Sequence, residues 1–535
     1  MRPGIDPFHP DDPWLNCHEN FSHHFTPNAS WQPHHDNGGA ASNFELYKRA
    51  TENLQWAIGE AIDNNRTLRA IGANWSFSDV GMCSGGMLQT KKLDLVFNVD
   101  DVLVAPWVAA GKKSDCLKFV ECGVQMSRLN KLLEVDTNPP RCIMASGGSN
   151  GQTIAGATST GTHGAALFTG AVHDAIVGIH LVTGRNTHVW LERKSNPVAS
   201  DSFISAIGAE PMRDDELFNA AVVSFGSFGI IHGIMLETEP LCLLKEYRID
   251  NFVYSDELMS AFAALDFPKL KALLPDIPDS KPGHELYHLE FNMNPYGVAK
   301  GGSGGIYVFL FYKVPVPSGF VVDQGGANTG PVPEFIWMMK NLLSLNLKKL
   351  THKIIKNRVT KEFQKNVRPA TPEPKTIGSI FRDTRFTGNI GSFAFAVATS
   401  DLPRTIDHIV EETAINAFAG AVAVRFVKGT QATLGFTRFE HTSVVEMDGV
   451  DMKPNHHVFE NVITRLINSN IPCTVHWGKL NSVLDANRVT NMYGVAAVQS
   501  WKQSREKLLS PETRAVFNND FMKKCGLDST SDIFV

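Results

Sequence analysis

Residues 145–164 read Ala-Ser-Gly-Gly-Ser-Asn-Gly-Gln-Thr-Ile-Ala-Gly-Ala-Thr-Ser-Thr-Gly-Thr-His-Gly, and this stretch is the most informative part of the chain. Its six glycines and seven serines or threonines can bury little apolar surface. Glycine lets the backbone approach a ligand closely, and successive N–H groups form a concave site for phosphate oxygens. The stretch therefore predicts an anion-binding loop, although a flexible linker has a similar composition. Ile154 and His163 favour the binding loop, because they are unusual in a linker.

Two further loops have the same character. Arg69–Ser78 follows a short apolar run and contains a glycine, an asparagine and two serines, and Ser224–Ile231 contains two glycines. The chain has no GxxxxGK[ST] P-loop, and no GxGxxG lies at a strand-to-helix turn. A phosphate-bearing ligand would therefore need an architecture other than the P-loop or the Rossmann fold.

Hydrophobic periodicity predicts alternating helices and strands in the first half of the chain and a different texture beyond Pro240. Single strands are expected at 68–72, 93–97, 116–121, 230–237, 286–292, 306–312, 393–398 and 421–427, and two strands around the turn 183–186 are expected within 175–189. The expected helices are at 44–62, 126–135, 217–221, 333–359, 402–418 and 458–467. The pattern favours a layered α/β or α+β domain, followed by a second domain with an antiparallel sheet and helices on one face.

Bulk properties exclude several classes of partner. Fifty basic and 55 acidic residues give a formal net charge of −5, which offers no electrostatic basis for binding nucleic acid or an anionic membrane. The chain start lacks the apolar core of a signal peptide, and no run reaches the roughly 18 apolar residues of a membrane helix. The sequence therefore predicts a cytoplasmic protein without a membrane span or a nucleic-acid partner.

The spacing of cysteines and histidines predicts no metal site. The eight cysteines are scattered and form no CxxC pair, so free thiols are favoured over disulfides. Residues 1–40 form a predicted irregular arm, rich in Pro, His, Asn and Asp. Five histidines lie between His18 and His35, but their spacing matches no familiar ligand pattern.

The three loops, in this order and spacing, resemble the FAD-binding domain of the vanillyl-alcohol oxidase and p-cresol methylhydroxylase family. They look most like its aldonolactone and alditol oxidase branch. Arg69–Ser78 is similar to an Arg-x-x-Gly-x-Gly-His-Ser-type loop, and Gln152–Gly164 is similar at nearly every position to the loop that follows in that branch. The later motifs of the branch are matched by Ile176–Gly184, Asp215–Phe218, Gly226-x-x-Gly229 and His476–Lys479.

The resemblance implies an α+β fold, with an FAD-binding domain of two subdomains and a substrate domain whose antiparallel sheet is covered by helices. The implied limits are an arm at 1–40, the FAD-binding domain at 41–241, the substrate domain at 242–455, and a segment at 456–535 that returns to the FAD-binding domain. The residues implied to hold FAD are Gly72, Ala73, Asn74, Trp75, Ser76, Ser149, Thr153, Gly156, Ser159, Gly161, Thr162, His163, Gly226, Gly229, Ile231 and Lys479.

The activity implied by the resemblance is oxidation of a CH–OH group on a small hydroxylated molecule, with hydride passing to flavin N5. Molecular oxygen would then reoxidise the flavin and give hydrogen peroxide. Two alternatives remain open: a dehydrogenase that uses another electron acceptor, and a flavin-binding protein whose pocket has a non-redox function. A sugar, polyol, lactone or other alcohol is the expected substrate, by analogy of fold alone.

Two positions depart from the family pattern. Many relatives carry a first-loop histidine that is bonded covalently to the flavin, and Trp75 stands at the matching position. Tryptophan cannot form that bond, so the sequence predicts non-covalent FAD, whether or not Trp75 also packs in the core. Alditol oxidases carry a Glu-x-Arg pair on a substrate-domain strand, where this chain has Ala423 and Arg425. The missing carboxylate argues against a typical alditol and leaves room for a bulkier, sterol-like alcohol.

Arg425 needs a partner if it is buried, because an unpaired buried charge costs several kcal/mol. Glu290, on a strand of the same domain, is the first candidate, and Glu440 and Glu446 are others. An Arg425 that reaches solvent and a solvent-facing Glu290 remain the alternatives.

Lys479 and His476 complete the expected catalytic set with Arg425 and Glu290. A cation at Lys479 would lie near flavin N1, where it would stabilise the anionic reduced ring. His476 would donate a hydrogen bond or transfer a proton, unless it only packs the C-terminal strand.

Overall fold

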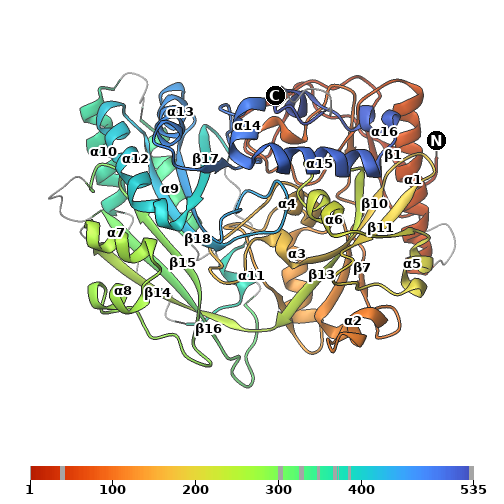
Figure 1. The fold of residues 1–535 in the computed structure, drawn as a ribbon, viewed down its shortest axis with the longest axis horizontal. Coiled ribbons are helices and arrows are strands. Elements are labelled where there is room, and N and C mark those ends of the chain that lie inside the picture. Colours follow the sequence, from red (N-terminus) through yellow and green to blue (C-terminus); the bar gives the residue numbers. More distant parts are fainter. Residues whose placement is uncertain are drawn as a thin grey trace.

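The computed structural model describes residues 2–36, 42–252, 254–298, 305–323, 331–345, 350–365, 370, 373–382 and 387–528. Figure 1 shows two domains side by side, with the C-terminal helices lying across the first of them. The first domain contains 11 strands in its two main sheets. These strands are β1 (Ile5–Pro7), β4 (Trp31–Pro33), β5 (Arg69–Ile71), β6 (Met87–Gln89), β7 (Val96–Asn98), β8 (Leu117–Glu121), β9 (Arg141–Ile143), β10 (Ile176–Val182), β11 (His188–Glu192), β12 (Glu210–Arg213) and β13 (Ile230–Pro240).

The two sheets form the two subdomains that the sequence predicts. The smaller sheet has the order β1-β4-β6-β5, and the larger has the order β12-β11-β10-β13-β8-β7, with β9 paired to β13. The first loop follows β5 of the smaller sheet, and the third loop precedes β13 of the larger sheet. The loops therefore meet where the two subdomains adjoin.

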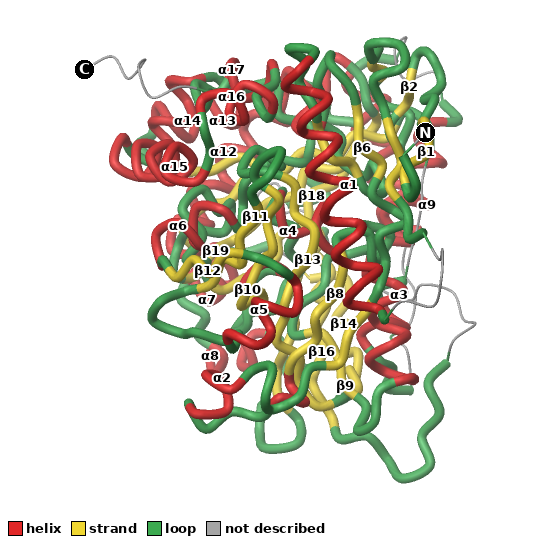
Figure 2. Tube along the Cα trace, turned by 90° about the vertical axis from the view of Figure 1, so that its right-hand side faces the viewer, coloured by secondary structure: helices red, strands yellow, loops and turns green. Residues whose placement is uncertain are grey.

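Helix α1 (Asn43–Asp63) confirms the predicted helix at 44–62. Ser42 and Glu45 form a capping box at its N-terminus, and Tyr47 and Leu54 lie on its buried face. Figure 2 shows α1 lying along the strands of the larger sheet. The other helices of this domain are α2 (Ala105–Ala109), α3 (Met126–Lys131), α4 (Ile154–Ser159), α5 (Asp201–Ile207) and α6 (Asp215–Ala221).

The second domain is built on one antiparallel sheet of seven strands. The strands are β14 (Leu243–Phe252), β15 (Glu285–Met293), β16 (Ile306–Val314), β17 (Ile390–Ala398), β18 (Gly420–Lys428), β19 (His441–Val450) and β20 (Cys473–Val475). Their order is β14-β16-β15-β18-β19-β17-β20. The helices are α7 (Asp256–Ala263), α8 (Phe267–Leu273), α9 (Pro331–Leu343), α10 (His352–Lys365), α11 (Ile377–Ile380), α12 (Leu402–Ile415) and α13 (Lys453–Asn468).

Helices lie on both faces of this sheet, rather than on one. Phe426 of β18 stacks on Phe262 of α7, with ring centroids 5.5 Å apart. Side chains alternate along a strand, so Arg425 lies on the opposite face. Tyr307 is on the Arg425 face and packs against Phe363 of α10, with ring centroids 4.7 Å apart. Helix α10 therefore covers part of the face that carries Arg425.

The single helix predicted at 333–359 is wrong, because the described residues form the two helices α9 and α10 there. Met338 and Met339 of α9 and Ile355 of α10 are buried in the same apolar cluster. The two helices contact each other, and both contact the sheet. A single straight helix over 333–359 would extend away from this cluster, so its two ends could not both pack against the same part of the sheet.

The C-terminal segment returns to the first domain after β20. Its helices are α14 (Ala486–Tyr493), α15 (Val495–Leu508), α16 (Pro511–Val516) and α17 (Asp520–Lys524). Trp501 of α15 is buried against Phe228, with ring centroids 5.0 Å apart. The predicted domain limit at 455/456 falls inside α13, which packs against α12 of the second domain.

The described part of the N-terminal arm is ordered on the surface of the first domain. Besides β1 and β4 it contains a short hairpin of β2 (Trp14–Leu15) and β3 (Ser22–His23). Trp14 is 5% exposed and packs against Phe21 and Phe25. Among the described residues, no helix has the length and hydropathy of a membrane span.

Candidate active site

One pocket lies between the three loops of the first domain and the sheet of the second. Of the 16 residues predicted to hold FAD, the structure brings 15 to this pocket, and Gly161 is the exception. Gly161 has φ +73° and lies at the turn after α4. The residues brought together are Gly72, Ala73, Asn74, Trp75, Ser76, Ser149, Thr153, Gly156, Ser159, Thr162, His163, Gly226, Gly229, Ile231 and Lys479.

The first two loops touch where glycine is required. A Cβ on Gly72 would lie 2.1 Å from Thr153 Oγ1, so a larger residue would push the loops apart. Thr153 also caps α4, since its side chain accepts a hydrogen bond from the Gly156 N–H. The close packing of these loops therefore explains the glycine at position 72.

The third loop also depends on unusual backbone conformations. Phe225, Gly226 and Gly229 have φ values of +56°, +71° and +101°. A Cβ on Gly229 would lie 2.6 Å from the carbonyl oxygen of Val182. The buried Arg69 side chain donates a hydrogen bond to the Gly226 carbonyl at 2.5 Å and thereby links the first and third loops.

The C-terminal segment lines the pocket next to the first loop and is hydrogen-bonded to it. The Phe77 N–H donates to the Gly478 carbonyl at 2.8 Å, and Ser78 Oγ donates to the Trp477 carbonyl at 2.7 Å. Asn519 Nδ2 donates to the carbonyls of Val80 and Met82. Hydrogen bonds to the first loop therefore hold the His476–Lys479 motif at the pocket.

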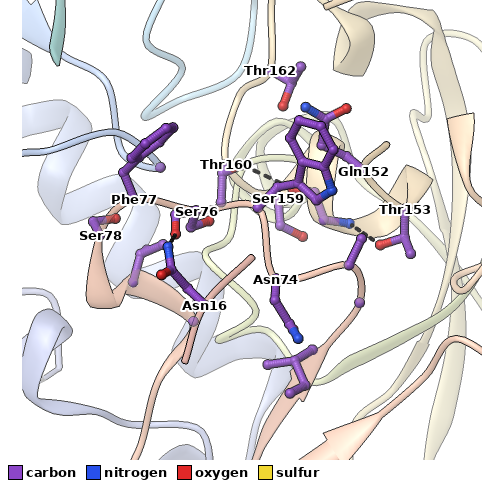
Figure 3. A pocket seen from close by; sticks show the side chains of 18 of the residues that line it. Asn16, Asn74, Ser76, Phe77, Ser78, Gln152, Thr153, Ser159, Thr160 and Thr162 are labelled. Atoms are coloured by element: carbon purple, nitrogen blue, oxygen red, sulfur yellow. Dashed lines mark hydrogen bonds between the residues drawn. The ribbon is translucent and has the colours of Figure 1, made fainter. Parts of the chain in front are cut away.

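Three pocket-lining side chains carry buried polar atoms that have no hydrogen-bond partner among the described residues. They are Asn74 Oδ1, Trp75 Nε1 and Gln152 Oε1. Buried polar groups normally form hydrogen bonds, and a buried donor or acceptor without a partner costs about 1–3 kcal/mol of folding free energy. Figure 3 shows Asn74 and Ser76 of the first loop and Gln152 and Thr162 of the second around the same space. These loops are therefore prepared to receive a polar ligand.

Four residues of the N-terminal arm also line the pocket, which the sequence did not predict: Trp14, Asn16, His18 and Phe21. Asn16 Nδ2 donates to the Ser76 carbonyl at 3.0 Å (Figure 3). The His18 ring stacks on Phe77 and meets Trp75 edge to face, at centroid distances of 4.2 and 5.2 Å. No local sequence motif in the arm predicts this role, because each contact joins residues that are far apart in the chain.

Arg425 lies at the second-domain end of the pocket between two carboxylates. Its Nε donates to Glu290 Oε2 at 3.1 Å, and its Nη1 lies 3.0 Å from Glu446 Oε2. Glu290 is directly opposite Arg425 in the β15–β18 pair, while Glu446 is opposite Ala423 in the β18–β19 pair. A carboxylate from the neighbouring strand therefore stands beside the position where the expected one is missing. Arg425 does not reach out to solvent, since it is 8% exposed.

Of the carboxylates considered for Arg425, Glu446 faces the pocket. Glu290 is buried, does not line the pocket and accepts a hydrogen bond from His288 Nε2 at 3.1 Å, whereas Glu440 is exposed. Lys479 Nζ donates to Glu446 Oε1. Burial alone would raise the pKa of Glu446, but Arg425 and Lys479 outweigh it and hold that pKa well below its usual range.

Asp448 is the second carboxylate that lines the pocket, after Glu446. It lies two residues after Glu446 on β19, hence on the same face, and accepts a hydrogen bond from Ser392 Oγ at 2.5 Å. Burial raises the pKa of the Asp448 carboxyl to about 6, although Lys479 opposes the rise. Asp448 is not among the site residues predicted from the sequence. The same-face spacing from Glu446 was the available signal, but it has meaning only once the strand is known to face the pocket.

Two neutral histidines face each other at the pocket, with ring centroids 5.5 Å apart. His476 Nδ1 accepts a hydrogen bond from the Gly478 N–H at 3.0 Å, so in the neutral ring the proton is on Nε2. His163 Nδ1 donates to the Gly164 carbonyl at 3.1 Å, which leaves its Nε2 as an acceptor. Burial lowers the pKa of His163 to about 4 and that of His476 well below its usual value. His476 is therefore a hydrogen-bond donor at neutral pH.

Part of the chain is similar in sequence to lactone-oxidising enzymes, while no family model matches it. A 185-residue stretch is 27% identical to D-arabinono-1,4-lactone oxidase of Candida glabrata and covers 34% of this chain and 29% of that protein. A 216-residue stretch is 27% identical to L-gulono-1,4-lactone dehydrogenase of Mycobacterium tuberculosis and covers 38% of this chain and 42% of that protein. The chain thus matches less than half the length of these relatives.

Solved structures match almost the whole chain. Cholesterol oxidase from B. sterolicum superposes with a TM-score of 0.64 at 13% identity and covers 98% of this chain and 100% of that one. Carbohydrate oxidase from Microdochium nivale superposes with a TM-score of 0.59 at 11% identity and covers 96% of both chains. The predicted fold class is confirmed. The chain has the fold of the vanillyl-alcohol oxidase and p-cresol methylhydroxylase flavoenzymes, and part of it is homologous to the aldonolactone oxidases and dehydrogenases.

Proposed function

We propose that this protein binds FAD non-covalently in the loop pocket and oxidises a CH–OH group of a hydroxylated molecule. The observation that carries the proposal is that three glycine-containing loops and the Arg425–Glu446–Lys479 cluster meet in one pocket. Within it, buried polar atoms of Asn74, Trp75 and Gln152 have no partner among the described residues. The loops fit a cofactor with phosphate and amide groups. Bound FAD would supply the acceptor for a hydride from the substrate carbon.

The side chains at and next to the pocket have different roles in the proposed reaction. Asp448 accepts the proton of the substrate hydroxyl, because its pKa near 6 leaves it as a carboxylate that is still basic. His476 Nε2 donates a hydrogen bond to the substrate oxygen. Arg425 and Lys479 hold positive charge beside the reacting groups, while Glu290 and Glu446 fix the positions of those cations.

Two features support the non-covalent mode and the range of substrates. Trp75 lines the pocket at the position matching the bonded histidine of many relatives, and its ring cannot form that bond. The sequence relatives named for lactones and the structural neighbours named for carbohydrate and cholesterol favour a lactone, a sugar or a sterol-like alcohol. Oxygen is the proposed acceptor, with hydrogen peroxide as the product, and a dehydrogenase reaction is the second candidate because one relative is so named.

Visible spectroscopy of the purified protein tests these proposals in order. A flavin spectrum is expected, and acid precipitation should leave the yellow colour in the supernatant; a yellow pellet would contradict the non-covalent mode. Lactones, sugars, polyols and sterols are then added without oxygen, and at least one should bleach the flavin. If none does, the oxidoreductase proposal fails. Admitting air to the bleached sample separates an oxidase, which releases peroxide, from a dehydrogenase.

A further inference from the structure

Two thiols lie close together at the junction between the two domains. Cys142 is on β9 of the first domain, and Cys242 lies between the end of β13 and the start of β14. Their sulfur atoms are 3.9 Å apart, and both cysteines are free. Cys142 is buried, whereas Cys242 is partly exposed. The pair is therefore accessible to a small reagent from the Cys242 side.

Lys313 and Glu239 surround the pair with charge. Glu239 is directly opposite Cys142 in the β9–β13 ladder, and both of its carboxylate oxygens accept hydrogen bonds from Lys313 Nζ, at 2.6 and 2.8 Å. The ligand atoms of Cys142, Glu239 and Cys242 lie within 4.8 Å of one another, as in a metal site. The Lys313 ammonium already occupies both carboxylate oxygens, however, and it would repel a cation.

The two sulfur atoms lie at hydrogen-bond distance, where either could be the donor, and Cys142 is the more deeply buried of the two. A proton held on Cys142 favours the thiolate at Cys242. The hydrogen bond from Cys142 lowers the pKa of the Cys242 thiol, and the positive charge of Lys313 lowers it further, against the effect of burial. The same hydrogen bond raises the pKa of Cys142, and burial adds to that rise. Cys242 is therefore the sulfur with thiolate character, and the thiolate is the form that reacts with peroxides.

We propose that Cys142 and Cys242 form a peroxide-sensitive thiol pair that closes into a disulfide across the domain junction. The Cys242 thiolate attacks one oxygen of hydrogen peroxide, the O–O bond breaks, and the leaving hydroxide takes a proton to become water. Cys142 then attacks the resulting sulfenic acid at sulfur, the S–S bond forms, and a second water leaves. Two thiols lose two electrons and two protons, and one peroxide becomes two waters.

Closure requires a short movement only. The sulfur atoms must approach from 3.9 Å to about 2.05 Å. Cys242 lies in the connection between two strands, outside the sheet ladders, so its side chain can turn toward Cys142. The bond would fasten β9 to the connection that carries the chain from the first domain to the second. This inference does not depend on the proposed cofactor or substrate.

Thiol counting and mass spectrometry on the full chain test the pair. Brief treatment with hydrogen peroxide should remove two of the eight thiols, lower the mass by two hydrogens, and link the peptides of Cys142 and Cys242 in a non-reducing digest. Dithiothreitol should restore both thiols. In Cys142→Ser, which keeps Cys242, the link should be absent and a sulfenic acid at Cys242 should be trapped by dimedone.

Cys116→Ser is the matched control. Cys116 is also partly exposed, but burial raises the pKa of its thiol, so its removal should leave the Cys142–Cys242 link unchanged. The proposal is overturned if wild-type protein keeps all eight thiols under peroxide, or if the peptide map joins other cysteines. It is also overturned if the purified protein holds stoichiometric zinc that must be chelated before Cys142 and Cys242 can be alkylated.

Discussion

Replacing Arg425 with methionine removes a guanidinium that contacts two buried carboxylates while keeping most of the side-chain volume. Glu290 would retain the hydrogen bond from His288, and Glu446 would retain Lys479, but one buried negative charge would be left uncompensated. Breaking a buried ion pair by removing one partner costs about 3–5 kcal/mol. Each kcal/mol lowers the Tm of a 150–250-residue domain by about 2–4 °C, so a fall of roughly 6–20 °C is expected for the second domain.

Differential scanning calorimetry of matched variants measures this fall. Arg404→Met is the control, because Arg404 lies on the surface of the same domain and pairs with Asp401 across one helical turn. A surface pair contributes less than about 1 kcal/mol, so the control should shift Tm by a few degrees at most. The double variant Arg425→Met/Glu290→Gln should recover part of the loss, because it also removes the stranded charge. A Tm for Arg425→Met equal to that of the control would refute the reasoning.

The remaining predictions concern the pocket. Gly72→Ala should purify with much less flavin per protein than wild type, because its Cβ would lie 2.1 Å from Thr153 Oγ1. The control variant Gly59→Ala, in the interior of α1, should keep its flavin. Equal flavin content in the two variants would contradict the steric argument. The rate of flavin reduction by substrate should rise with pH and level off above about 6, as Asp448 loses its proton and becomes able to accept one, and Asp448→Asn should be slow at every pH; an unchanged profile in the variant would remove Asp448 from this role. Asn16→Ala should release FAD several-fold faster than wild type in a flavin-fluorescence assay, because the Ser76 carbonyl loses a hydrogen bond, and an unchanged rate would show that the arm does not support the first loop.

The loops were predictable because their chemistry is local. Gly226 and Gly229 have backbone conformations that favour glycine, and Gly72 leaves room for Thr153 of the second loop. Each loop therefore carries its glycines within one short segment, where they can be recognised in the sequence. The helix at 44–62 was predictable for a similar reason, because its buried face and capping box lie within one segment. The order and spacing of the loops then pointed to the family.

The site features that could not be predicted from the sequence depend on contacts between residues that are far apart in the chain. Glu446 stands beside Arg425 because of the β18–β19 register, and no local pattern ranks it above Glu440, which is exposed. The arm residue His18 reaches Trp75 and Phe77 through contacts that span more than fifty positions. The break between α9 and α10 follows from packing on the sheet, which overrides the helical periodicity of 333–359.

The hydrogen bonds between the first loop and the C-terminal segment have a consequence for biosynthesis. Ser78 and Trp477 are 399 positions apart in the chain, so a ribosome makes the loop long before it makes the groups that hold it. Domains generally fold as units from the N-terminus during translation. In this protein the first loop lacks its hydrogen-bond partners Trp477 and Gly478 until nearly the whole polypeptide has been made. A nascent chain that stalls before Gly478 would therefore lack part of its cofactor pocket.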